Sequence, residues 1–291
     1  MSEALIFCRF AHFASAMALF GAMAFLAFLA PRRLAARLDR PVGSLGVAAA
    51  ICAAATAVAW LLLEAAEMGE GWRDAYNPDV VASVLVDTAF GRIWTGRLAL
   101  GAALAGLVIL APARRSAAAI LSGLFLASLG LVDHASMREG ALGAFERLNQ
   151  AAHLTCGGFW IGSLPPLLFA LGHLKDAAVK SEAGLALRRF SRLGHFAVAG
   201  VFATGIVNTA IILGQPPIDL ASPYQLLLDI KIALVVAMTA LALFNRYVLV
   251  PRFAVSPDAS LRALVGTSIV EIALGGAVLA LVSAFATFEP R

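Results

Sequence analysis

Long blocks of apolar residues recur along the sequence, and they constrain the fold more than any other feature. One of them, residues 149–173 (NQAAHLTCGGFWIGSLPPLLFALGH), is long enough as a helix to cross a bilayer, which takes about 20 residues. Of all residues, 61% are hydrophobic and 14% are charged, a composition that excludes a soluble one- or two-domain protein. The sequence therefore predicts an all-α, polytopic membrane protein whose main partner is the lipid bilayer.

Eight transmembrane helices are expected from these blocks. They cover approximately residues 4–30, 44–66, 93–111, 117–135, 149–173, 189–213, 223–249 and 262–286. Most of the connections between them are short, which makes consecutive spans antiparallel neighbours. The longest connection, 67–91, contains a stretch that predicts a short helix, which lies on the membrane surface or caps the bundle. No internal repeat or soluble domain is visible, so residues 1–291 are interpreted as a single transmembrane unit.

Basic residues are distributed unevenly between the connections. Those after the first, third, fifth and seventh spans hold 14 of the 22 lysines and arginines. The other connections and the termini are acidic or neutral. By the positive-inside rule the basic connections face the cytoplasm, which places both termini in the periplasm of a bacterial inner membrane. Membrane topology thus accounts for the net charge of +4, and no nucleic-acid partner is expected.

Histidine and cysteine occur together in two of the spans. His12 is expected about 12 Å below the outer end of the first span, with Cys8 one turn away on the same face. His153 and Cys156 begin the fifth span, also on the outer side. The alternative for each residue is structural: a membrane histidine often forms an interhelical hydrogen bond, and a buried cysteine usually packs as a small hydrophobe.

The outer end of the fourth span adds further ligand-type side chains, because Asp133, His134 and Met137 lie there. The fourth and fifth spans form a hairpin, so His134 is expected to meet His153. Thiolate, imidazole and thioether groups together favour copper, as Cu⁺ or Cu²⁺, over hard cations. The expected metal ligands are His12, His134 and His153, with Cys8, Cys156, Met137 and Asp133 as further candidates.

Charged residues inside the spans need partners, because an unpaired charge in the bilayer is costly. Arg97, Lys231 and Glu271 are of this kind. They are interpreted as ion pairs that fix helix order, for example Glu271 with Lys231 or Arg97. The alternative is an ion pathway through the bundle. Asn208 and Asn245 are expected to add interhelical hydrogen bonds.

Several segments resemble the copper resistance protein D family, and together they cover most of the chain. They are the N-terminal RFAHFASAMALFGAMAF, TAFGRIWTGRLAL (88–100), AAHLTCGGFWIGSLPPLL (151–168), RFSRLGHFAVAGVFATGIVNT (189–209) and SPYQLLLDIKIALVVAMTALALFNRYVLVP (222–251). Cys156 stands where the family pattern more often has a small apolar residue, so its ligand role rests on its chemistry alone.

The resemblance implies an eight-span inner-membrane protein of copper resistance, transport or homeostasis. Members of the family are described as moving copper inward or accepting it from a periplasmic copper-binding protein. Such a protein is not an enzyme. No Walker A or phosphorylation motif is present, so the sequence gives no sign of an ATP-driven pump. The outer segments lack His-rich or Met-rich runs, so we expect either that a separate periplasmic protein captures the copper or that the site itself is shallow.

Two other functions are compatible with the sequence. Histidines on separate helices at similar depth also suit bis-histidine ligation of a b-type haem, which would make the protein an electron carrier. A Soret absorption band would identify that case. Alternatively, the protein could be an assembly factor that delivers copper to an oxidase.

Overall fold

The computed structural model describes residues 2–132, 140–214, 216–217, 219 and 221–285, and these contain helices but no strands. In chain order the elements are α1 (Ser2–Ala24), η1 (Phe25–Leu29), α2 (Arg32–Met68), η2 (Asp74–Tyr76), α3 (Pro78–Asp87), α4 (Ala89–Leu110), α5 (Arg115–Ala127), η3 (Ser128–Leu131), α6 (Gly140–Gly162), α7 (Leu164–Gly172), η5 (His173–Lys175), α8 (Lys180–Leu213), α9 (Pro223–Phe244), η6 (Asn245–Leu249), α10 (Val250–Arg252) and α11 (Pro257–Phe285).

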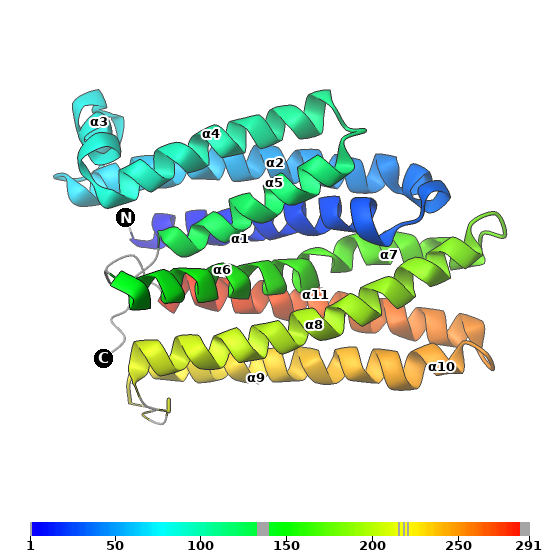
Figure 1. Ribbon diagram of the computed structural model, residues 1–291. Helices are drawn as coiled ribbons and strands as arrows, with labels where there is room; N and C mark the ends of the chain where they lie inside the picture. Colours follow the sequence, from blue (N-terminus) through cyan, green and yellow to red (C-terminus); the bar gives the residue numbers. More distant parts are fainter. Residues whose placement is uncertain (1, 133–139, 215, 218, 220, 286–291) are drawn as a thin grey trace.

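The long helices lie side by side and alternate in direction (Figure 1). Helices α1, α4, α6 and α9 run from one end of the bundle to the other, and α2, α5, α8 and α11 run back. The end at which α1 begins is called the N-terminal end here. Within the described residues, seven helical segments are long and apolar enough to cross a membrane, and Arg115–Leu131 is a shorter apolar helix. The all-α polytopic fold is confirmed, and this shorter helix takes the place of the fourth expected span.

Several helices extend beyond their apolar blocks. Helix α2 begins at Arg32 and α8 at Lys180, whereas the sequence predicted starts at 44 and 189. Hydropathy marks the part of a helix that suits lipid, but the backbone continues as helix into polar surroundings. The surface helix expected in the second connection is present as α3, and the Asn77 side chain caps it by accepting from the backbone N–H of Asp79 (3.1 Å).

The kink expected at Pro165 and Pro166 is also present. Helix α6 ends at Gly162 and α7 begins at Leu164, so the chain changes helix at Ser163. The prolines sit in the first turn of α7, where a missing N–H costs no helical hydrogen bond. Together α6, α7 and η5 form one long apolar segment, Gly140–Lys175.

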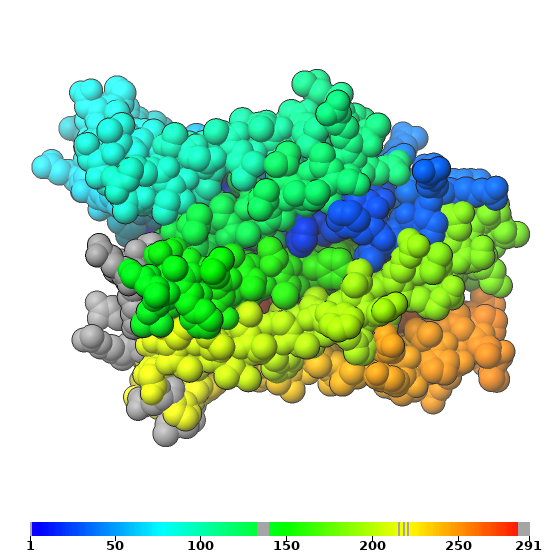
Figure 2. Space-filling model, in the orientation of Figure 1, coloured from blue at the N-terminus to red at the C-terminus, as the bar shows by residue number. Residues whose placement is uncertain are grey.

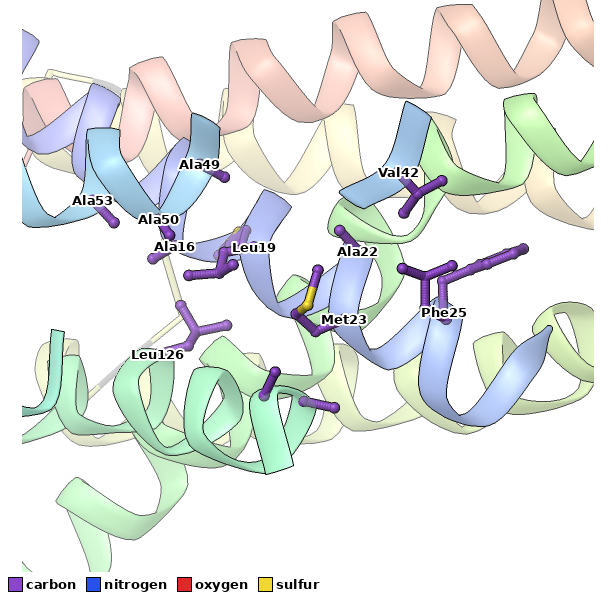
Figure 3. Close-up of a cluster of buried hydrophobic side chains, with 14 of the residues drawn as sticks. Ala16, Leu19, Ala22, Met23, Phe25, Val42, Ala49, Ala50, Ala53 and Leu126 are labelled. Carbon is purple, nitrogen blue, oxygen red and sulfur yellow. The ribbon is translucent and has the colours of Figure 1, made fainter. Parts of the chain in front are cut away.

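The bundle consists of two groups of helices, which lie on opposite sides of the molecule (Figure 2). The larger core cluster comes mainly from α1, α2, α4, α5 and α7. Its small residue Ala16 of α1 lies near Ala50 of α2, whereas Ala22 lies nearer Val42, and the small side chains let the two helices approach closely (Figure 3). A second cluster joins α6, α8, α9 and α11 through Trp160, Ala197, Val201, Met238 and Val278.

Helices α1 and α6 join the two groups through a close glycine crossing. A Cβ on Gly162 would lie 2.0 Å from the Met17 carbonyl oxygen, and a Cβ on Gly21 would lie 1.9 Å from the Gly162 carbonyl carbon. No side chain fits at either position, so the two backbones touch. This contact fixes which residues of α1 and α6 share a depth in the bundle.

Candidate metal site

His12 lies inside the first helix group, and both of its ring nitrogens have partners. Nδ1 is 2.9 Å from the Thr56 hydroxyl oxygen, and Nε2 is 2.8 Å from Nη2 of Arg97. The Thr56 hydroxyl donates to the Cys52 carbonyl (2.7 Å), so its oxygen accepts from Nδ1–H. Arg97 is a donor and never an acceptor, so Nε2 carries the lone pair. The contacts therefore define a neutral imidazole whose lone pair faces Arg97.

Arg97 is 1% exposed and is held by the surrounding helices. Its Nη1 donates to the Phe125 carbonyl (2.9 Å) and to the Ser128 hydroxyl (2.5 Å). The guanidinium carbon lies 5.0 Å from the Trp94 ring centroid and 4.6 Å from that of Phe125. Aromatic faces and carbonyl oxygens stabilise the charge where water cannot.

Cys8 lies near His12 because both contact Thr56. Its thiol donates to the Thr56 carbonyl oxygen over 3.4 Å, and the side chain is buried. Aromatic rings enclose the imidazole: the centroids of Trp60 and Trp94 are 5.6 and 5.9 Å from that of His12. The thiol and Nδ1 of the imidazole thus both lie beside Thr56, while Nε2 lies beside Arg97.

His153 has a matching arrangement in the second helix group. Its Nδ1 is 2.8 Å from the Thr204 hydroxyl oxygen on α8. Thr204 donates to the Gly200 carbonyl (2.5 Å), so the imidazole again donates from Nδ1 and keeps its lone pair on Nε2. Cys156 packs on the same face of α8, where a Cβ on Gly200 would come within 2.5 Å of its sulfur.

Asparagines extend this polar contact toward the N-terminal end of the bundle. Asn149 donates to the Thr204 carbonyl (3.0 Å) and to the Asn208 side chain (2.7 Å). Asn208 in turn donates to Gln150 (2.7 Å). The interhelical role predicted for Asn208 is confirmed.

Glu271 has a different partner from the one expected. It accepts a hydrogen bond of 2.6 Å from Asn245, and Asn245 accepts one from Thr267 at 2.6 Å. The example of an ion pair with Arg97 is wrong, because Arg97 donates to His12, Phe125 and Ser128 instead, and the pairing with Lys231 stays a prediction. The prediction of an interhelical bond from Asn245 is confirmed.

The structure brings the candidate ligands together as two pairs. Cys8 and His12 face α2 and α4, whereas His153 and Cys156 face α8. Within the part of the chain that the structure describes, no three His, Cys, Asp or Glu residues form a group that could hold a metal ion. The other three candidates, Asp133, His134 and Met137, lie outside the described residues. His12 and His153 contact different helices, so the structure does not bring these two of the three expected imidazoles together, and the third, His134, is not described.

Sequence reasoning missed the residues that orient the imidazoles. Thr56 and Thr204 each accept from an Nδ1–H, and Arg97 donates to an Nε2. A threonine in an apolar helix usually bonds to its own backbone, so its type gives little signal. A weak signal was available in Thr204, because it precedes Gly205 within the segment 189–209 that resembles the family.

A multi-pass helical membrane protein with one buried and one half-buried pair of thiol and imidazole groups is the class that this fold and site define. Comparison with known families identifies the family within this class. Residues 1–144 match the family described as copper resistance protein D-like, N-terminal domain, and residues 184–285 match the family described as copper resistance protein D. The chain belongs to the copper resistance protein D family.

Curated relatives agree with this membership. The chain is 37% identical to "Inner membrane protein YebZ" of Escherichia coli strain K12, over 97% of both chains. It is 31% identical to "Copper resistance protein D" of Pseudomonas syringae pv. tomato, over 84% of this chain and 82% of that protein. It is 28% identical to "Copper transport protein CutJ" of Bacillus subtilis strain 168, over 60% of this chain and 34% of that protein. No solved structure matches the chain.

Proposed function

We propose that this protein binds copper in the periplasmic half of its helix bundle and passes it on, as part of copper uptake or homeostasis. The role is binding and transport, without catalysis. Family membership supports copper handling in general. The observation that carries the specific proposal is the Cys8–His12 pair, since a soft thiol and an imidazole on one membrane helix have the chemistry that copper prefers.

The threonine contacts support a ligand role for the imidazoles. A metal-binding histidine usually donates its second N–H to an oxygen, which fixes the ring and directs the other nitrogen at the metal. His12 and His153 both do this, with Thr56 and Thr204 as acceptors. Their Nε2 atoms are therefore the proposed ligand atoms, and thiols nearby favour Cu⁺.

At His12, copper binding is an exchange of one cation for another. Arg97 donates to the nitrogen that the ion would use. The ion therefore has to displace the guanidinium, which keeps hydrogen bonds to the Phe125 carbonyl and to Ser128. His134, Asp133 and Met137 remain candidates from the sequence for completing the coordination.

The orientation of the protein follows from its charges. Arg114 precedes α5 and Arg115 begins it, at the end opposite the N-terminal end (Figure 1). The positive-inside rule assigns that end to the cytoplasm, so both termini and both thiol–imidazole pairs lie toward the periplasm. A periplasmic copper-binding protein is the proposed donor.

Copper binding by the purified protein tests the proposal. We expect the wild type to retain Cu⁺ against a calibrated chelator and the double variant His12→Gln, His153→Gln to lose it. His195→Gln is the control, because His195 bonds to the Ser191 carbonyl of its own helix (2.7 Å). Copper retention unchanged in the double variant would refute the site. A Soret band from the purified protein would instead support the haem alternative.

A further inference from the structure

Helices α1 and α6 carry the same short pattern at the same depth. His12 lies nine residues before Gly21, and His153 lies nine residues before Gly162. The two glycines meet at the crossing, and both helices run in the same direction (Figure 1). Because each histidine is nine residues from the glycine at the crossing, the two imidazoles lie at closely similar depth in the bundle.

The surroundings of the two histidines are repeated as well. Each donates from Nδ1 to a threonine on the next long helix, Thr56 of α2 or Thr204 of α8. Each threonine donates to the carbonyl four residues earlier in its own helix. The cysteines do not follow the repeat, because Cys8 lies one turn before His12 and Cys156 lies one turn after His153. The helix directions are repeated too. Helices α1, α2, α4 and α5 alternate in direction in the same way as α6, α8, α9 and α11, as in membrane proteins built from parallel repeats (Figure 1).

The two imidazoles point away from each other. His12 contacts Thr56 and Arg97 and packs on rings of α2, α4 and α5. His153 contacts Thr204 of α8 on the other side of the α1–α6 crossing. The touching backbones at Gly21 and Gly162 hold this arrangement, because neither helix can rotate without bringing a side chain into the crossing.

We infer that the bundle holds two copper sites, one in each helix group, with His12 and Cys8 in the first and His153 and Cys156 in the second. This inference rests on the proposed function and specifies it. The sites differ in access. His12 is fully buried and its lone pair faces Arg97, whereas His153 is half-buried. Copper therefore fills the His153 site first.

Counting bound Cu⁺ in single variants distinguishes two sites from one shared site. We expect two ions per wild-type chain and one in either His12→Gln or His153→Gln. The remaining ion is bound more tightly in His12→Gln, which keeps the accessible site. If one substitution alone removes all copper, the ligands share one ion and the inference is overturned while the proposed function stands. A wild type that binds no copper ends the proposed function itself.

Cysteine variants give a second test of the two sites, with smaller changes to the side chains. Cys8→Ser and Cys156→Ser change one atom each, and each is expected to weaken copper binding at its own site at least tenfold. Ser283→Ala is the control, because the Ser283 hydroxyl bonds to the Leu279 carbonyl of its own helix (2.8 Å), and its binding curve should equal that of the wild type. If Cys8→Ser weakened the binding of both ions equally, the result would contradict two separate sites.

Discussion

Arg97 stands at the nitrogen of His12 that a metal would use. Its Nη2 is 2.8 Å from Nε2, and its charge is buried among aromatic rings. Such an arginine opposes the binding of a metal cation in two ways. It donates a hydrogen bond to the Nε2 lone pair, and its charge repels the metal ion. We therefore expect Arg97 to set the copper affinity of the proposed His12 site.

Removing this charge should raise the copper affinity of the His12 site. Arg97→Gln frees Nε2 and removes a repulsion of about 2 kcal/mol in a protein-like dielectric, so we expect about tenfold tighter binding or more. Chelator competition on His153→Gln, which isolates the first site, measures the change. Arg246→Gln removes the same charge from an arginine that bonds to Ser191 in the second group, and it should have no effect. Weaker binding in Arg97→Gln would show that the arginine only supports the fold.

Thr56 and Thr204 should act through the histidines. Thr→Val at either position keeps the shape but leaves Nδ1–H without its acceptor, so copper affinity at that site should fall by about 10- to 100-fold. Thr155→Val is the control, because the Thr155 hydroxyl bonds to the carbonyls of Ala151 and Ala152 in its own helix. Binding titrations of the three variants make the comparison. Equal losses in all three would mean that the threonines have no specific role.

At the scale of the helices, the α1–α6 crossing holds the two groups together. Gly162→Ala would place a methyl group 2.0 Å from the Met17 carbonyl oxygen. Because backbone cannot move aside cheaply, we expect a loss of about 3 kcal/mol in stability. Thermal unfolding in detergent should show a clearly lower Tm.

Gly157→Ala supplies the matched control on the same helix. A Cβ there has no atom within 4 Å, and alanine favours helix over glycine by about 1 kcal/mol, so its Tm should stay the same or rise. A Tm for Gly162→Ala equal to that of Gly157→Ala would contradict the close crossing.

Apolar length and proline placement were enough to predict most elements. The long helices, the surface helix α3 and the break near Pro165 follow from local sequence. Helix ends such as Arg32 of α2 could not be predicted, because hydropathy changes at the lipid boundary while the helix continues. The direction in which His12 and His153 point was also beyond the sequence, since it depends on the crossing at Gly162, a contact between distant segments.

At the scale of the whole molecule, periplasmic copper sites require that the N-terminal end of the bundle faces the periplasm. Ser83 on α3 and Ser116 at the start of α5 are exposed at opposite ends of the bundle. In a Cys52→Ser background, a membrane-impermeant thiol reagent added outside the cytoplasmic membrane should label Ser83→Cys and leave Ser116→Cys unlabelled until the membrane is opened. The reverse pattern would place both thiol–imidazole pairs on the cytoplasmic side.

We propose one copper site in each of the two helix groups, and therefore two copper ions per chain. Anomalous diffraction at the copper absorption edge, from crystals of the copper-loaded protein, tests this most directly. The account predicts two peaks at similar depth on either side of the α1–α6 crossing, one beside Nε2 of His12 and one beside Nε2 of His153. A single peak between α1 and α6, or copper found at neither histidine, would contradict it.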